Sequence, residues 1–94
     1  MPRCQIILAD DHRMFAEGLK RSLEPEHHVL DIVDNGEQLV EVVVKLKPDI
    51  VVTDISMSGL NGIEAARRIR ERCPKSKVIL LTMHEDPVYA STAL

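Results

Sequence analysis

Aromatic residues are scarce in this sequence of 94 residues, which has one phenylalanine, one tyrosine and no tryptophan. A buried core must therefore be built from Val, Ile and Leu, which suits a sheet covered by helices on both faces. No apolar run approaches the length of a membrane span or of the apolar part of a secretion signal, so we expect no membrane partner. The two cysteines are too few for a disulfide framework, and a reducing cytoplasm is the expected compartment.

The chain also lacks a strong excess of charge of either sign. Its formal net charge is −3, with 29% charged and 45% hydrophobic residues, which is typical of an ordinary soluble globular domain. The length allows one domain, over residues 1–94. The negative balance argues weakly against direct contact between this segment and nucleic acid.

Strand and helix patterns alternate along the chain. The spacing predicts strands over residues 6–9, 29–33, 50–54 and 77–82, and helices over residues 12–24, 37–47 and 63–72, with a fourth helix from Asp86-Pro87 that has no closing signal before Leu94. Phe15, Leu19 and Leu23 form the apolar stripe of the first helix. Residues 37–47 favour a helix over a strand by the smallest margin, because their three consecutive valines would also suit a strand. This order predicts an α/β fold, a doubly wound parallel sheet with right-handed crossovers.

Acidic side chains follow two of the predicted strands where each strand ends. Asp10 and Asp11 come directly after the first strand, and Asp54 ends the third. Because ligands bind at the carboxyl ends of the strands in such sheets, we expect the three carboxylates to share one crevice, with Thr82 at the end of the fourth strand. Without a cation, repulsion should raise the pKa of at least one carboxylate. Oxygen ligands, with no His or Cys expected among them, suit Mg²⁺, which is usually shared with a phosphate.

A carboxylate beside Mg²⁺ can act as a nucleophile on phosphorus and form an acyl phosphate. This chemistry predicts Asp54 as the acceptor, with the hydroxyl of Thr82 donating a hydrogen bond to a phosphoryl oxygen. Added charge at one point predicts a local rearrangement that is sensed elsewhere in the protein.

Three motifs together resemble a known family. They are Asp10-Asp11-His12, the segment Asp54-Ile55-Ser56-Met57 with Gly59-Leu60-Asn61-Gly62, and Leu80-Leu81-Thr82-Met83. The chain resembles the receiver domain of bacterial two-component response regulators, above all the NarL/FixJ type that precedes a LuxR-type DNA-binding domain. The resemblance implies a flavodoxin-like, CheY-like sheet with strand order 2-1-3-4-5.

The resemblance also implies the role of each site residue. Asp54 would accept the phosphoryl group from a sensor histidine kinase, and Thr82 would be the switch hydroxyl. Mg²⁺ would be bound directly by Asp11, Asp54 and the backbone carbonyl of Ser56, and through water by Asp10. DNA would be contacted only through an output domain absent from this chain.

Two departures from the family pattern affect these expectations. Ser58 stands where the family usually has proline, which should loosen the loop without removing a ligand. The family's fifth strand, its invariant lysine and its last helix would lie beyond Leu94, so the resemblance describes a receiver that is incomplete at the C-terminus. Residues 78–81 would then form an apolar edge with unpaired backbone groups. We therefore expect self-association, as a homodimer or a swapped oligomer.

Other functions fit less well or remain open. A phosphatase of the haloacid dehalogenase type needs a second Asp two residues after the nucleophile, where this chain has Ser56. A nucleotide-binding domain needs a glycine-rich loop after the first strand, where Asp10-Asp11-His12 stands instead. The open alternative is a truncated receiver that binds Mg²⁺ without switching and acts as an interaction or dimerisation module. His12 flanks the proposed site, where it could tune the carboxylates, but we expect it to be a solvent-facing loop residue.

Overall fold

The computed structural model describes residues 3–57, 59–81 and 91–92, in which strands and helices alternate. The elements are β1 (Gln5–Ala9), α1 (Arg13–Leu23), β2 (His28–Val33), α2 (Gly36–Leu46), β3 (Ile50–Asp54), α3 (Gly62–Arg72), β4 (Lys77–Leu81) and β5 (Ser91–Thr92). The first four strands and the three helices agree with the sequence prediction to within one residue at each end. Among the described residues, no helix has the length and apolar character needed to cross a membrane.

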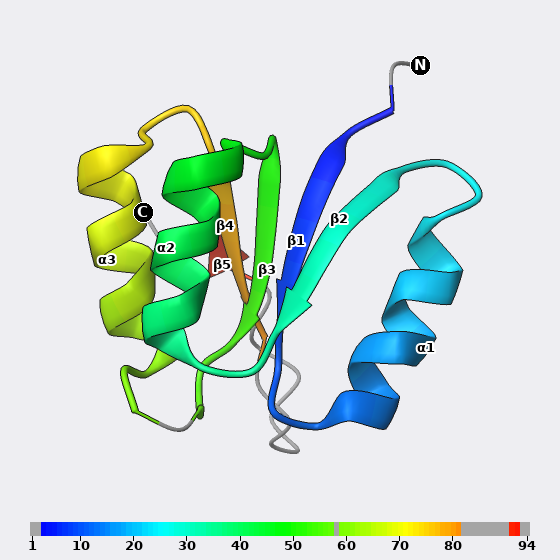
Figure 1. Ribbon diagram of the computed structural model, residues 1–94, viewed down its shortest axis with the longest axis horizontal. Helices are drawn as coiled ribbons and strands as arrows, with labels where there is room; N and C mark the ends of the chain where they lie inside the picture. Colours follow the sequence, from blue (N-terminus) through cyan, green and yellow to red (C-terminus); the bar gives the residue numbers. More distant parts are fainter. Residues whose placement is uncertain (1–2, 58, 82–90, 93–94) are drawn as a thin grey trace.

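The sheet has the strand order β2-β1-β3-β4-β5, and its first four strands are parallel. Figure 1 shows α2 and α3 side by side on one face of the sheet and α1 on the other. The predicted doubly wound α/β fold is therefore confirmed. All four parallel strands end at the lower edge of the sheet in this view, where the loops that follow β1 and β3 lie.

The edge of β4 differs from the prediction. β5 pairs antiparallel with β4, placing Thr92 opposite Ile79 and Ser91 opposite Leu80. The expectation of an unpaired β4 edge is therefore wrong, and the predicted fourth helix does not continue through this part of the chain. Its predicted start at Asp86-Pro87 lies outside the described residues. The physical reason is that unpaired backbone groups along an apolar strand favour pairing with any available extended segment.

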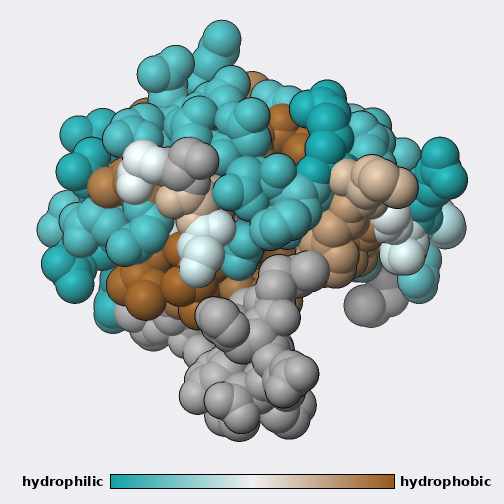
Figure 2. Space-filling view, turned by 90° about the horizontal axis from the view of Figure 1, so that it is seen from below, coloured by the Kyte–Doolittle hydropathy of each residue, from teal (hydrophilic) through white to brown (hydrophobic). Residues whose placement is uncertain are grey.

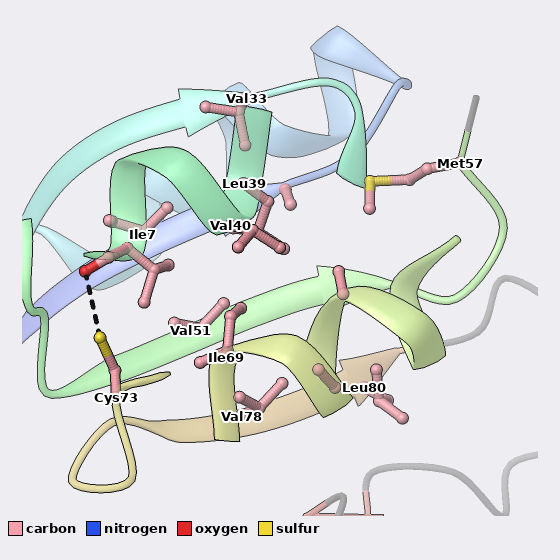
Figure 3. Packing of buried hydrophobic residues seen from close by; sticks show 14 residues of the cluster. Ile7, Val33, Leu39, Val40, Val51, Met57, Ile69, Cys73, Val78 and Leu80 are labelled. Carbon is pink, nitrogen blue, oxygen red and sulfur yellow. Dashed lines mark hydrogen bonds between the residues drawn. The ribbon is translucent and has the colours of Figure 1, made fainter. Parts of the chain in front are cut away.

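The larger part of the core lies between the sheet and the α2–α3 layer. Its buried side chains come from all four parallel strands, from both helices and from the loop residues Met57 and Cys73, and Figure 3 shows them packed together: Ile7, Ala9, Val33, Leu39, Val40, Val43, Val51, Met57, Ala65, Ala66, Ile69, Cys73, Val78 and Leu80. The Cys73 thiol also contacts the carbonyl oxygen of Val43 at 3.8 Å, the dashed line in Figure 3. α2 and α3 are therefore fixed firmly against the sheet.

The valine-rich segment forms α2 rather than a strand. Leu39 and Val43, one helical turn apart, are both fully buried, so the helical spacing places both in the core. The side chain of Asn35 accepts a hydrogen bond from the backbone N–H of Gln38 at 2.8 Å and caps the helix. Lys47 closes it in the left-handed conformation, with φ at 50°.

The α1 side of the sheet is covered less completely. Leu19 and Leu23 pack against a smaller core cluster of Ile6, Leu8 and Val29. Phe15, however, is 38% exposed, and Ala16 takes the buried position in the first part of the helix. The predicted inward stripe is therefore correct for Leu19 and Leu23 and wrong for Phe15.

Candidate functional site

Two neighbouring strands bring the predicted acids together. β1 pairs with β3 so that Ala9 lies opposite Thr53, and the next residues along the two strands are Asp10 and Asp54. Both carboxylates are almost completely buried, with relative exposures of 6% for Asp10 and 4% for Asp54. Asp11 is more exposed. One potential ligand atom from each of Asp10, Asp11, His12 and Asp54 lies within 4.8 Å of the others, and we call these four residues the acidic cluster.

Asp10 orders the start of the loop that follows β1. Its Oδ1 accepts a hydrogen bond from the backbone N–H of His12 at 2.8 Å and lies 3.0 Å from Nδ1 of the same residue. His12 is the N-cap residue of α1, and its side chain makes no capping hydrogen bond. Asp10 is therefore a buried acceptor that holds the backbone and the ring of His12, rather than a helix cap.

The sequence places His12 beside the proposed site as a solvent-facing residue, and the structure adds close contacts with the acids. The His12 side chain is 61% exposed, yet Nδ1 lies 3.1 Å from Oδ1 of Asp11 and 4.0 Å from Oδ2 of Asp54. The prediction that no His joins the acids is wrong. The hydrogen bond to Asp10 raises the pKa of the imidazole, and the charge of Asp11 raises it further. The signal in the sequence was the spacing of an Asp two residues before the His, which favours a local side-chain contact.

The surroundings of Asp54 disfavour the charged form of its carboxylate. Burial raises its pKa first, and the charges of Asp10 and Asp11 add to the increase. A backbone hydrogen bond from Ser56 to Oδ1, at 3.3 Å, partly opposes the shift. Repulsion from neighbouring carboxylates does raise the pKa of Asp54, as the sequence predicts for at least one of the acids. Desolvation of the Asp54 carboxylate contributes more than this repulsion.

The loop after Asp54 is fixed by backbone and side-chain contacts. The N–H of Gly62 donates to the carbonyl of Ile55 at 2.8 Å, and a Cβ at Gly62 would collide with the carbonyl oxygen of Asp54. Asn61 caps α3 by accepting a hydrogen bond from the N–H of Glu64 at 2.9 Å. Glycine at position 62 therefore allows α3 to begin directly against the end of β3.

The predicted roles of two other site residues, Ser56 and Thr82, stay predictions. The N–H of Ser56 contacts Asp54, whereas metal binding by the Ser56 carbonyl stays a prediction. Thr82 lies outside the described residues, so its predicted role is not tested. β4 pairs with β3 through Leu81 opposite Asp54, and Thr82 is the next residue in the sequence.

The donor set of the acidic cluster fits a divalent cation. Three carboxylates lie close to one imidazole. An added cation would reduce the repulsion between the carboxylates and would stabilise the buried negative charge of Asp54. An open pocket beside the cluster carries further polar groups and is lined by Asp10, Asp11, Arg13, Ile32, Val33, Asp34 and Gln38. Figure 2 views the molecule from this end, and most of the coloured surface is hydrophilic, with hydrophobic atoms gathered in separate patches.

Comparison with known sequences identifies relatives of this chain. It matches the family model of the response regulator receiver domain over residues 6–94. The transcriptional regulatory protein DegU of Brevibacillus brevis is 42% identical over 94 residues, covering 98% of this chain and 40% of DegU. The nitrate/nitrite response regulator protein NarL of Escherichia coli K12 is 34% identical over 87 residues, covering 88% of this chain and 40% of NarL. The chain thus spans about two fifths of the length of these relatives.

Solved structures agree with the sequence comparison. The signal receiver domain of the response regulator NarL from Mycobacterium tuberculosis superposes with a TM-score of 0.83 at 28% identity, covering 93% of this chain and 72% of that one. A LuxR-family two-component response regulator from Aurantimonas sp. SI85-9A1 gives a TM-score of 0.83 at 32% identity, covering 89% of this chain and 61% of that one. The fold is therefore that of CheY-like receiver domains, and the chain belongs to the response regulator receiver domain family.

Proposed function

We propose that this receiver domain accepts a phosphoryl group on Asp54 from a sensor histidine kinase in a Mg²⁺-dependent reaction. The observation that carries the proposal is the acidic cluster, in which buried Asp54 at the end of β3 meets Asp10 and Asp11. The relatives DegU and NarL are named as regulators, DegU of transcription, which supports control of a DNA-binding output domain in a longer protein. The proposed receiver unit is residues 1–94, and its proposed compartment is the cytoplasm.

The two oxygens of Asp54 are suited to different tasks. Oδ1 accepts the hydrogen bond from the N–H of Ser56, which fixes the plane of the carboxylate. Oδ2 faces His12 at 4.0 Å and has no closer hydrogen-bond donor among the described residues. Oδ2 is therefore the atom that attacks phosphorus, forming a P–O bond while the P–N bond to the kinase histidine breaks.

Asp10 and Asp11 supply the negative charge that holds a cation next to the attacking oxygen. Mg²⁺, when bound, would neutralise the charge that gathers as the phosphoryl group approaches three carboxylates. The Ser56 carbonyl is a further candidate ligand, and Thr82 is the candidate donor to a phosphoryl oxygen. Both roles are proposed from family resemblance.

Intact-mass measurement after incubation with Mg²⁺ and acetyl phosphate tests this proposal. In this reaction the phosphoryl group moves to Asp54 and acetate leaves. We expect a gain of one phosphoryl group in the wild-type chain, and none in Asp54→Asn or when EDTA removes the cation. Asp34→Asn is the matched control, because Asp34 lines the neighbouring pocket outside the cluster and should leave the adduct intact. An adduct that persists in Asp54→Asn would contradict the assignment.

A second candidate function is self-association without switching, and one surface favours it. On the α1 side of the sheet, Ile50 and Val52 of β3 are only partly buried. Ile79 of β4 pairs with Val52, so it lies on the same face, and it too is only partly buried. Among the described elements, α1 packs mainly against β1 and β2, and we propose that the apolar face over β3 and β4 binds a second copy of the chain. Because β5 pairs with β4, this face is a better candidate for a dimer contact than the β4 edge.

Sedimentation at increasing protein concentration tests the second candidate. We expect a dimer in the wild-type chain and a monomer in Ile79→Lys, which places a charge on the apolar face. Met14→Lys is the control, because Met14 is 90% exposed on α1 and lies outside this face. Absence of the phosphoryl adduct together with a dimer would favour this candidate. A strictly monomeric wild-type chain would exclude it.

A further inference from the structure

A second pocket lies at the opposite end of the sheet from the acidic cluster. It stands where β3 and β4 begin, at the upper edge of the sheet in Figure 1, and its volume of about 470 Å³ is within the range of small-molecule sites. Its lining residues come from the ends of α2 and α3 and the segments that follow them: Lys47, Pro48, Asp49, Arg72, Cys73, Pro74, Lys75 and Ser76. We propose that this basic pocket binds a small anion with at least two negative charges, a polyphosphate or a polycarboxylate.

Three cations line the basic pocket without a counter-charge of their own. Lys47, Arg72 and Lys75 are exposed, and none of them forms an ion pair with a carboxylate among the described residues. Earlier on α3, by contrast, Arg68 lies 3.9 Å from the carboxylate of Glu64. Several cations around one pocket attract a polyvalent anion more strongly than a monovalent one. The charge of the pocket thus indicates the class of ligand.

The carboxylate that lines the pocket belongs to Asp49, and the fold uses it to join strands. Its Oδ2 accepts a hydrogen bond from the backbone N–H of Gln5 at 2.8 Å, at the start of β1. The backbone N–H of Asp49 donates to the carbonyl of Gln5 at 2.9 Å, and its carbonyl accepts from the N–H of Lys77 at 3.0 Å. Asp49 therefore connects the starts of three neighbouring strands, and its single charge only partly offsets the three cations.

The walls of the pocket are fixed by contacts within the fold. The hydroxyl of Ser76 is buried and donates to the carbonyl of Pro48, which joins the segment after α3 to the segment after α2. The N–H of Ser76 donates to the carbonyl of Cys73 at 3.0 Å and closes the turn that carries Lys75. Pro48 and Pro74 restrict the backbone of the two segments. A preformed site has less backbone to order when a ligand binds, which favours affinity.

The helix ends account for part of this charge but not for all of it. Lys47 is the C-cap residue of α2 and Arg72 ends α3, where cations offset the negative end of the helix dipole. Lys75 lies beyond both helices, yet it lines the same pocket. Replacing Lys75 therefore separates anion binding from helix stability.

Calorimetric titration in metal-free buffer, with pyrophosphate and separately with citrate, tests the proposal in the wild-type chain, Lys75→Gln and Lys45→Gln. Lys45 is the matched control, because it is exposed in the last turn of α2 and does not line the pocket. We expect Lys75→Gln to weaken binding by about tenfold, the effect of losing one charged hydrogen-bond donor, and Lys45→Gln to leave it nearly unchanged. Asp49→Asn keeps an acceptor oxygen for Gln5 and removes the opposing charge, so it should strengthen binding.

The two anions distinguish the possible sources of negative charge. Tighter binding of pyrophosphate would assign the pocket to phosphates, and tighter binding of citrate would assign it to carboxylates. The absence of saturable binding of either anion to the wild-type chain would overturn the proposal. Equal weakening in Lys75→Gln and Lys45→Gln would also overturn it, because overall charge rather than the pocket would then attract the anion. The outcome is separate from the proposed function, since the titration contains neither metal nor phosphodonor and Asp54 lies at the other end of β3.

Discussion

Glu37 at the start of α2 accepts a hydrogen bond on Oε1 from the backbone N–H of Leu60, at 3.2 Å. This contact joins α2 to the loop that follows Asp54, although the two residues are far apart in the sequence. Gly59 lies against the same carboxylate in a left-handed conformation, with φ at 70°. The loop that departs from the family pattern at Ser58 is thus held from the side by a neighbouring helix.

Removing this contact should destabilise the fold measurably. We expect Glu37→Ala to lower the free energy of unfolding by about 0.5–1.5 kcal/mol, because the N–H of Leu60 loses its acceptor. Glu37→Gln keeps an acceptor oxygen and loses only the charge at the helix start, so its effect should be smaller. Urea unfolding of the two variants makes the comparison. Equal losses would show that helix-end charge, rather than the hydrogen bond, stabilises this region.

Two glycine substitutions should have effects of opposite sign. In Gly62→Ala, the new Cβ would collide with the carbonyl oxygen of Asp54 and stand 3.0 Å from Cα of Ile55, so we expect a loss of about 1–3 kcal/mol. In Gly18→Ala, on exposed α1, the Cβ meets nothing within 4 Å, and we expect a gain of about 0.5–1 kcal/mol. Thermal unfolding gives both values. A neutral Gly62→Ala would mean that α3 can move away from β3 at little cost.

The buried carboxylate of Asp54 should make the metal-free fold less stable as pH rises. Burial raises its pKa in the folded chain, so the folded state binds this proton more tightly than the unfolded state. The resulting penalty is absent below the ordinary pKa of Asp and complete above the raised value. We therefore expect Asp54→Asn to melt at a higher temperature than the wild-type chain at neutral pH in EDTA, with the difference shrinking as the solution is acidified. A difference that does not depend on pH would argue against a charged Asp54.

The imidazole of His12 should titrate above the ordinary range of histidine. The hydrogen bond to Asp10 is the largest cause of the raised pKa, followed by the charge of Asp11. Stabilisation from this contact is complete below the ordinary pKa of His and is lost as pH rises through the raised value. We expect NMR titration without metal to show Asp10→Asn lowering the pKa of His12. A larger effect from Asp11→Asn would reverse the order of the two causes.

The strand ends and the carboxylates could be predicted because local signals coincide there. Asp54 ends an apolar strand directly before a loop rich in turn-forming residues, and Asp10 follows another strand, so parallel pairing alone brings them together. The contact of His12 depends on a ring orientation that the spacing of residues favours but does not determine. The exposure of Phe15 depends on where α1 lies over β1 and β2.

β5 could not be predicted for a different physical reason. Its two residues, Ser91 and Thr92, are too few to show a strand pattern. They are extended because β4 offers backbone partners, which is a property of the assembled sheet. The predicted helix relied on local capping signals, and at Ser91–Thr92 tertiary pairing outweighed them.

The pairing of β1 with β3 determines when the site can exist during folding. Ile6 pairs with Ile50, and the two strands join segments more than forty residues apart, with β2 and α2 between them in the chain. Such non-local ladders close late and slowly compared with helices, because a long loop must first be ordered. Asp10 and Asp54 are therefore neighbours only after the central ladder has closed. A nascent or partly folded chain therefore lacks the acidic cluster, and under the proposed function it could not yet accept a phosphoryl group.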